Sequence, residues 1–439
     1  ATADAAKVVA FETELAKIQK DRTELRDPVA TYNRLDRDGV LKLAKKLDWK
    51  GYWKAIGYPK TKLINVSVPS FVEALPALLE GTDMDTIKAY LRFHVINGNA
   101  SDLSSEIDAA AFGFSAMLTG QQQQEPEWKR CLGKTQFAFG DVIGKQFVDQ
   151  AFAGDSRDIA IAMIQDIEAA LEAALPGLAW MDDKTREAAI GKAKKVKNKI
   201  GYPSKWKSYE KVEIGDDFFQ NGLNASRHEY ERVMDKIGGK VDPEEWFMPP
   251  SMVNAYYNPL ANDINFPAGI LQPPFFSRDF PKAMNYGAIG MVMGHELTHG
   301  FDDTGRKFDG DGVMTEWWAP EVAAKFEEQA ACIENAYSEY EVQPGMFING
   351  KLTLGENIAD IGGLKAAHAA YMKWAEQNPE ESPIPGVSSE QLLFVAYAQN
   401  WCQKISPEME KVRVLSDVHS PGRFRAVGAL SNNPAFWEA

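Results

Sequence analysis

The first half of the chain is patterned as a series of amphipathic helices. Apolar side chains recur three and four residues apart, the spacing that lines one face of an α-helix. Four segments carry this pattern most clearly: 5–20, 70–80, 83–98 and 157–175. The polar run GQQQQEPEW is predicted to be a loop. A further helix is expected from residue 182 onward, ended by Gly201 and Pro203.

The pattern changes after a mixed polar segment over 206–218, which is typical of a linker. Residues 252–271 contain two short β-like runs, separated by Asn-Pro and Asn-Asp turn signals. Helical spacing then returns in a segment that begins near Ala283 and in three later ones: 317–340, 356–374 and 389–404. We therefore predict an α-rich α+β protein, with a mostly helical part over 1–205 and a helix-rich part with a small sheet over 206–439.

Composition narrows the class of protein. Hydrophobic residues make up 45% and charged residues 25% of the 439 positions, as in ordinary globular proteins. The formal net charge of −14 repels phosphate, so nucleic acid is not expected as a partner. No apolar run reaches the roughly 18 residues of a membrane span. The three cysteines, taken by count alone, favour reduced and buried thiols.

The segment GHELTHG at 294–300 indicates metal chemistry. On a helix, His295 and His299 lie on one face and can aim both imidazoles at one ion. Glu296 is rotated by about 100° from His295, so it is better placed to act on a bound water than to join the ligands. The alternative is an amphipathic helix with two partly buried histidines. Gly290 and Gly294 indicate close approach by another segment.

A catalytic zinc site needs three protein ligands and one open position. Asp302 and Gly305 stand where a longer histidine motif would place a glycine and the third histidine, so a carboxylate from elsewhere is expected. In LGENIADIGG, Glu356 could complete the ligand set, and Asp360 could accept the free N–H of a ligand histidine. The alternative is a surface helix with two carboxylates.

Two other polar groups are candidates for supporting roles. The segment SDVHSPGRFR offers His419, oriented by Asp417, as a donor to the oxyanion of a tetrahedral intermediate. By itself this segment is also compatible with a structural loop. Asp302 and Asp303 follow the second histidine closely. Their sequence does not separate contact with a ligand histidine from helix capping or surface charge.

Five motifs in this order carry a family resemblance: NAYY, GHELTHGFDD, GENIADIGG, NWC and DVHSPGRFR. The chain resembles the neprilysin and endothelin-converting-enzyme family of zinc endopeptidases, over essentially its whole length and most strongly from 250 to 430. The resemblance implies a two-lobed zincin. Residues 206–439 would form a thermolysin-like zinc catalytic domain with a small sheet, and 1–205 a mostly helical capping lobe that restricts access to the site.

The resemblance also implies roles for individual residues. One Zn²⁺ per chain would be bound by His295, His299 and Glu356. A zinc-bound water would be activated by Glu296 as general base, and further catalytic roles would fall to Asp360, His419 and Asp417. Substrate would be bound by Asn254, Ala255 and Arg425, and its side chain by a hydrophobic pocket of Ile270, Phe275, Met291, Val292 and Trp401. Asn400 stands where that pocket usually has an aliphatic residue.

The implied function is hydrolysis of small peptides on the amino side of large hydrophobic residues, with phosphoramidate-type inhibitors binding the zinc. The implied location is extracytoplasmic, that is secreted, periplasmic or a membrane-anchored ectodomain. Cys131, Cys332 and Cys402 match family cysteines whose partners lie in segments absent from this sequence, which reverses the expectation of reduced thiols. Two alternatives stay open: a catalytically silent peptide-binding protein on the same fold, and another peptidase with two histidines and one glutamate. The complete catalytic set favours the enzyme.

Overall fold

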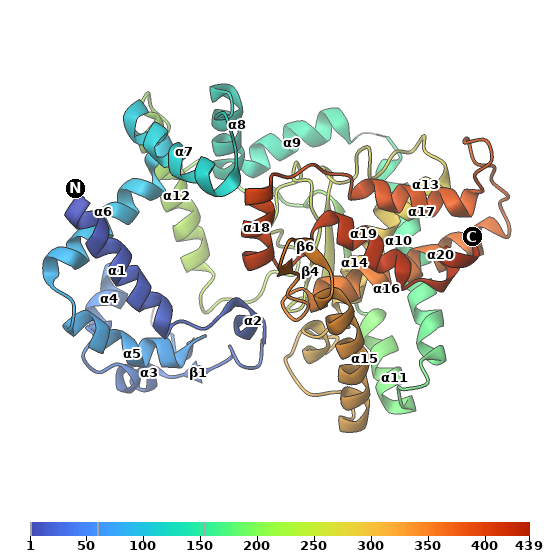
Figure 1. Ribbon diagram of the computed structural model, residues 1–439, viewed down its shortest axis with the longest axis horizontal. Coiled ribbons are helices and arrows are strands. Elements are labelled where there is room, and N and C mark those ends of the chain that lie inside the picture. Colours follow the sequence, from blue (N-terminus) through green and yellow to red (C-terminus); the bar gives the residue numbers. More distant parts are fainter. Residues whose placement is uncertain (1, 59–60, 153) are drawn as a thin grey trace. The chain divides into compact units, whose positions relative to one another are not determined.

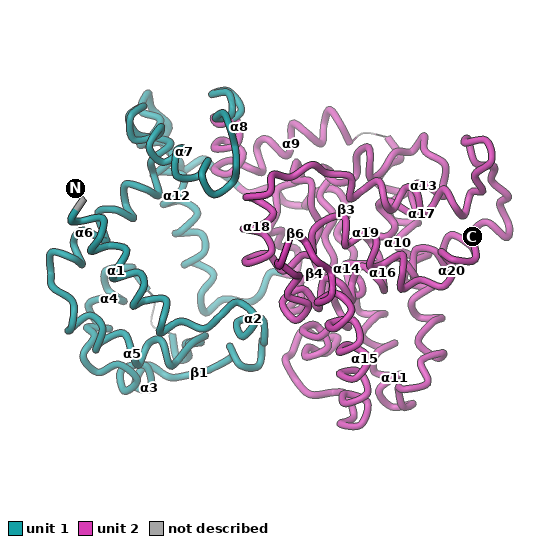
Figure 2. The backbone as a smooth tube through the Cα atoms, viewed as in Figure 1, with its two compact units in different colours: residues 1–129, 208–242 teal, residues 130–207, 243–439 magenta. Residues whose placement is uncertain are grey.

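The computed structural model describes residues 2–58, 61–152 and 154–439 (Figure 1). The chain forms two compact units, neither of which is continuous in sequence (Figure 2). The first comprises 1–129 and 208–242, and the second comprises 130–207 and 243–439. The boundary predicted at 205/206 falls near the point where the chain leaves the second unit for the first. Whether the helical part caps a site stays a prediction.

The first unit is helical, as the periodicity predicts. Its helices are α1 (Thr2–Ile18), α2 (Arg22–Leu25), α3 (Arg37–Leu43), α4 (Trp49–Ala55), α5 (Pro69–Glu80), α6 (Met84–Gly98), α7 (Ser105–Thr119) and α12 (Phe218–Asp235). The short strands β1 (Arg34–Leu35) and β2 (Ile64–Asn65) pair antiparallel. Helix α1 packs on α5 and α6. Local signals set the helix ends: Asp83 caps α6 by accepting from Thr86 N at 2.9 Å, and Gly120, at φ 69°, ends α7.

The second unit holds the remaining elements, except that α8 (Glu127–Ala138) begins in the first. Its helices are α9 (Gly140–Ala151), α10 (Ser156–Ala174), α11 (Asp183–Ala193), α13 (Lys282–Asn285), α14 (Met291–His299), α15 (Pro320–Ser338), α16 (Leu354–Ala375), α17 (Ser389–Asn400), α18 (Pro407–Ser416), α19 (Gly422–Ser431) and α20 (Pro434–Glu438). A π-helical turn, Tyr286–Gly290, joins α13 to α14. The hairpin strands are β6 (Glu341–Gln343) and β7 (Met346–Phe347).

A three-stranded sheet lies in this unit, with β5 (Asp263–Pro267) in the centre. The edge strand β4 (Tyr256–Asn258) pairs antiparallel with β5, and β3 (Lys197–Gly201) pairs parallel with it. The two β-like runs predicted within 252–271 are thus confirmed. The helix expected from residue 182 up to Gly201 is wrong in its second half, because α11 ends at Ala193. Residues 197–201 form a strand instead because they pair with β5. All five residues of β5 are buried, so β5 is a central strand that needs a partner on this side.

The main apolar core of the second unit surrounds α14 and α16. Helix α10, α16 and the π-helical turn pack against α14, and α15, α17 and α19 contact α16. Fully buried aromatic side chains fill the space around these helices: Phe266, Phe276, Tyr286, Tyr337, Tyr371 and Tyr397. The two helices that carry the candidate ligands are therefore held on a rigid, densely packed base.

Candidate functional site

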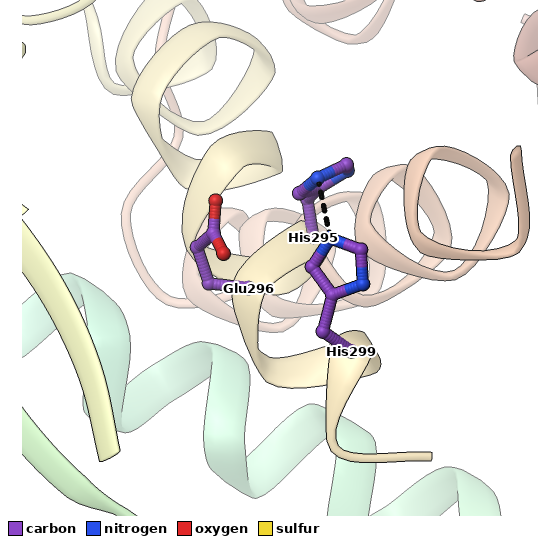
Figure 3. Close-up of side chains that lie close together, drawn as sticks. All are labelled: His295, Glu296 and His299. Atoms are coloured by element: carbon purple, nitrogen blue, oxygen red, sulfur yellow. Dashed lines mark hydrogen bonds between the residues drawn. The ribbon is translucent and has the colours of Figure 1, made fainter. Parts of the chain in front are cut away.

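Helix α14 brings the two histidines of the predicted motif together. His295 Nε2 and His299 Nε2 lie 3.0 Å apart, and the two imidazole planes are nearly perpendicular, at 86° (Figure 3). Glu296 extends from the same turn of the helix, and no hydrogen bond joins it to the rings (Figure 3). One donor atom from each of the three residues lies within 4.8 Å of the others. The geometry is that of two ligands with a carboxylate beside them.

The third ligand candidate comes from α16, which crosses α14 with almost no side chain between the two backbones. A Cβ on Gly294 would lie 2.6 Å from Gly363 O, and one on Gly362 would lie 2.7 Å from Thr298 Cγ2. Only glycine permits this approach, since ordinary van der Waals contact begins at 3.4 Å. The close crossing places the first turn of α16, with Glu356, next to the histidines.

Three donor atoms converge in this way. Glu356 Oε2 lies 3.3 Å from His295 Nε2 and 3.6 Å from His299 Nε2. Ligand atoms about 2.0–2.1 Å from a tetrahedral zinc ion stand about 3.3 Å from one another. The observed separations of 3.0, 3.3 and 3.6 Å bracket that value. Burial opposes the charge of Glu356, but the two imidazoles hold the pKa of its carboxyl well below the usual value. The donor set therefore fits a zinc ion.

Each imidazole has a carboxylate behind it. Asp302 Oδ2 lies 2.7 Å from His299 Nδ1, and Asp360 Oδ1 lies 2.8 Å from His295 Nδ1. The second pair lies at ion-pair distance, and His295 Nδ1 makes no hydrogen bond within the described residues. With protons on both Nδ1 atoms, two Nε2 lone pairs and a carboxylate oxygen face one point. Without a metal ion, protons on the imidazoles would have to offset the repulsion between these three atoms; burial opposes such protonation, but the neighbouring carboxylates raise the pKa of both histidines. With a metal ion, the same three atoms would be its ligands.

Asp302 is the supporting residue whose role the sequence left open. Its other oxygen, Oδ1, accepts from Thr304 N, Thr304 Oγ1 and Gly305 N at 2.6–2.9 Å. Burial opposes its ionisation, but His299 and these backbone donors lower the pKa of the carboxyl. Its position three residues beyond His299, where the helix ends, was the available signal. The contact with a candidate ligand is thus observed, and capping of the following turn accompanies it.

Glu296 is almost fully buried, at 6% exposure. Burial raises the pKa of its carboxyl, and the nearby imidazoles of His295 and His299 oppose this. A carboxylate whose proton affinity is increased by burial is a better general base than one in water. The environment therefore suits the role that the sequence predicts.

The loop between α18 and α19 brings His419 to the same cluster. His419 Nε2 lies 3.2 Å from Glu356 Oε2, and its Nδ1 lies 2.7 Å from Asp417 Oδ1. The loop is tied to α16 by a buried contact that the sequence analysis missed: Ser420 Oγ donates to Asn357 Oδ1 at 2.8 Å. Asn357 follows Glu356 directly, so α16 positions both the third ligand candidate and the His419 loop.

Arg425, on α19, lies beside this cluster. Its Nε and Nη2 donate to the two oxygens of Asp360 at 2.7 and 2.6 Å, and Nη2 is 3.9 Å from Glu356 Oε2. The guanidinium also stands over the Trp401 ring, with Cζ 3.9 Å from the centroid. Burial disfavours the charge of Arg425, but Asp360 raises the pKa of the guanidinium above its usual value. Arg425 is thus in place to hold Asp360 behind His295.

The predicted substrate-binding residues lie on the same unit. Asn254 and Ala255 immediately precede the edge strand β4. The predicted pocket residues belong to the main apolar core or pack against it: Ile270, Phe275, Met291, Val292 and Trp401. The amide atoms of Asn400 are shielded from solvent, and within the described part of the chain they have no hydrogen-bond partner.

The cysteines differ from the first expectation of buried thiols. Cys131, Cys332 and Cys402 are all exposed and form no disulfide within the described residues. Their exposure contradicts the expectation, drawn from their number, that the thiols are buried. The expectation that they form disulfides with other segments stays a prediction. None of the described helices has the length and apolar character needed to cross a membrane.

Comparison with known proteins extends over the whole chain. Profiles described as peptidase family M13 match residues 1–203 and 254–439. An endothelin-converting enzyme homolog of Locusta migratoria is 38% identical over 98% of this chain and 62% of its own length. Human endothelin-converting enzyme 1 is 38% identical over 98% of this chain and 58% of its own length. The chain thus spans about six-tenths of these relatives.

Solved structures agree with this result. The Mycobacterium tuberculosis zinc metalloprotease Zmp1, in complex with an inhibitor, matches 99% of this chain and 67% of its own with a TM-score of 0.95 and 34% identity. PepO from Lactobacillus rhamnosis matches 100% of this chain and 68% of its own, with a TM-score of 0.90 and 29% identity. The resemblance drawn from the five motifs is confirmed, and the chain belongs to peptidase family M13.

Proposed function

We propose that this chain is a zinc-dependent endopeptidase that hydrolyses small peptides on the amino side of large hydrophobic residues. The observation that carries the proposal is the triangle of His295 Nε2, His299 Nε2 and Glu356 Oε2, with sides of 3.0, 3.3 and 3.6 Å, beside the buried Glu296. These three atoms would hold one Zn²⁺ per chain. When bound, the ion would supply Lewis-acid polarisation of a carbonyl and of a water molecule.

The residues around the ion would divide the proton and charge chemistry between them. Glu296 would take a proton from the attacking water and return it to the leaving amine. His419 would donate from Nε2 to the oxyanion. Because Nδ1 already faces Asp417, donation from both nitrogens requires an imidazolium, and the Asp417 carboxylate is the partner that such a charge needs.

Asp360 and Asp302 would fix the orientation of the two histidines through their Nδ1 atoms. Arg425, already paired with Asp360, would bind a substrate carbonyl as well. Asn254 and Ala255 would bind the substrate main chain as an added strand next to β4. The residue after the cut bond would enter the pocket of Ile270, Phe275, Met291, Val292 and Trp401.

Three further points of the proposal follow from family membership. The helical residues of the first unit, which make up most of the lobe predicted over 1–205, would cap the catalytic domain and admit only short peptides. Phosphoramidate-type inhibitors would bind the zinc. The protein would act outside the cytoplasm.

The test uses the purified protein with zinc content measured by elemental analysis and peptide products identified by mass spectrometry. We expect about one zinc per chain and cleavage before Phe or Leu, abolished by a chelator, by a phosphoramidate inhibitor and by Glu296→Gln. A matched control is Glu328→Gln, which removes an exposed carboxylate on α15 outside the site. Hydrolysis that survives Glu296→Gln would refute the mechanism. A zinc-loaded protein that binds peptides without cutting them would favour the silent binding protein.

A further inference from the structure

Lys192 is a buried cation that the proposed chemistry does not use. It lies near the end of α11, and its exposure is 2%. Its Nζ donates to three backbone carbonyls, Gly300 O at 2.6 Å, Gly305 O at 2.9 Å and Phe308 O at 2.6 Å. An ammonium has three protons, so these three acceptors use all of them. All of its acceptors belong to the segment over 300–308, more than one hundred residues away in sequence.

This segment is the one that supports a ligand histidine. It starts directly after His299 and contains Asp302, whose carboxylate lies 2.7 Å from His299 Nδ1. Two of the acceptors of Lys192, Gly300 O and Phe308 O, come before and after Asp302 in the sequence. Gly305 packs closely against the end of α14, as shown by the collision that an added Cβ would make with His299 O. The ammonium therefore closes a loop whose geometry sets the position of Asp302.

The surroundings of Lys192 are shaped to hold a cation in place. Its Nζ lies 5.5–5.8 Å from the ring centroids of Tyr257, Phe301 and Trp317. Such rings attract a cation through their faces. Trp317 Nε1 also donates to Phe308 O at 3.1 Å, so the same carbonyl is fixed from a second direction. The loop is thus tied at one point by a cation and closed around it by aromatic side chains.

An apolar residue of similar length would fill this volume without the energetic cost of burying a charge. Burial lowers the pKa of Lys192 to about 7, and the carboxylates of Asp302 and Asp309 oppose this. A methionine would avoid that cost but would remove one donor from each of the three buried carbonyls. Phe308 O would keep Trp317 Nε1 and Gly305 O would keep Phe308 N, whereas Gly300 O would lose the donor that Lys192 provides. The charge of Lys192 is therefore explained by the carbonyls of the 300–308 segment that it binds. That segment in turn carries Asp302, which contacts His299.

We propose that Lys192 is a positioning residue of the metal centre, which fixes the 300–308 segment so that Asp302 stays on His299 Nδ1. The proposal rests on the proposed zinc site. According to this proposal, Lys192 strengthens zinc binding although its side chain contacts none of the ligand side chains. It acts through the main-chain carbonyls that its ammonium binds.

The test measures zinc affinity of the folded full chain by competition with a chelator, a readout that does not depend on peptide hydrolysis. Lys192→Met is expected to lower zinc affinity by about 10- to 100-fold, the effect typical of losing a partner of a ligand histidine. Asp302→Ala is expected to do the same. If Lys192 acts through Asp302, the double variant binds zinc no more weakly than Asp302→Ala alone.

Lys199→Met is the matched control, since Lys199 is also a buried lysine of the second unit. Its Nζ bonds to Asp263 Oδ2 at 2.7 Å and Glu245 O at 3.0 Å, away from the 300–308 segment. It should lose thermal stability and keep its zinc affinity. If Lys192→Met does not fold, Lys192→Gln, which retains two donors, replaces it and is expected to give an intermediate loss.

Wild-type zinc affinity in a folded Lys192 variant, or losses that add in the double variant, would overturn the positioning role. Failure of the proposed function has a different signature: the wild-type chain would bind no zinc in the same competition, or would bind it without cutting any peptide. In the second case the effect of Lys192 on zinc affinity would still be measurable.

Discussion

The close crossing of α14 and α16 gives the sharpest prediction for this site. A Cβ added at Gly363 would lie 2.8 Å from Met291 O and from His295 Cα, and nearer still to His295 N. These are backbone atoms, so no side-chain rotation relieves the contact. Restoring ordinary contact at 3.4 Å requires the two helices to separate by about 0.6 Å or more at this point.

That displacement is large on the scale of metal coordination. Functional metal–ligand distances vary by only about 0.2 Å, and Glu356 is carried by the helix that would move. Gly363→Ala should therefore weaken zinc binding by about 10- to 100-fold, comparable with loss of a supporting partner. Overpacking of this kind also destabilises a protein, typically by about 1–3 kcal/mol.

The assay is zinc affinity by chelator competition, together with urea unfolding and peptide cleavage at saturating zinc. Gly191→Ala is the control, because Gly191 lies on α11 with nothing within 4 Å of the added Cβ. That variant should keep wild-type zinc affinity and gain about 0.5–1 kcal/mol of stability from helix propensity. A folded Gly363→Ala chain with wild-type zinc affinity would refute the argument that glycine contact positions the third ligand.

Three further outcomes can be measured. Burial opposes the charge of Asp417, but hydrogen bonds from His419 and Arg413 lower its pKa. Its stabilising effect is then present above about pH 4 and is lost as pH falls toward the lower folded pKa, so Asp417→Asn should flatten the acid loss of stability in urea titrations. Asn357→Ala leaves Ser420 Oγ without its acceptor and should cost about 1–3 kcal/mol, lowering kcat more than zinc affinity. Removing zinc that was present at 100 times its Kd should lower the free energy of unfolding by about 2.7 kcal/mol, seen as a lower Tm in calorimetry.

The helices of this chain were predictable because their signals are local. The apolar spacing that predicts the helix over 83–98 and the N-cap residue Asp83 that begins α6 lie in one short stretch. Strand β3 was not predictable in the same way. Residues 197–201 follow a helix without a strong turn signal, and only pairing with β5, more than sixty residues later, makes them a strand.

The residues of the candidate site also differ in whether local sequence signals predict them. His295, Glu296 and His299 were predictable from helical geometry. Glu356 and His419 were candidates because a zinc peptidase needs a third ligand and an oxyanion donor, and the family resemblance implied these roles and added that of Arg425. The contact between Asp302 and His299 was within reach of the sequence but could not be separated from capping, and the structure shows that the carboxylate does both.

Lys192 and Asn357 show where sequence reasoning stops. Lys192 binds main-chain carbonyls, which every residue has, so its partners leave no mark in the sequence. Asn357 bonds to Ser420, and nothing in the spacing of the two predicts the contact. Both residues act by joining segments that carry the recognisable motifs. The proposed metal centre combines residues of α14, α16 and the His419 loop, so it depends on these contacts between segments as much as on its ligands. An error of a few tenths of an ångström in any one segment would disturb a triangle whose sides are only 3.0–3.6 Å.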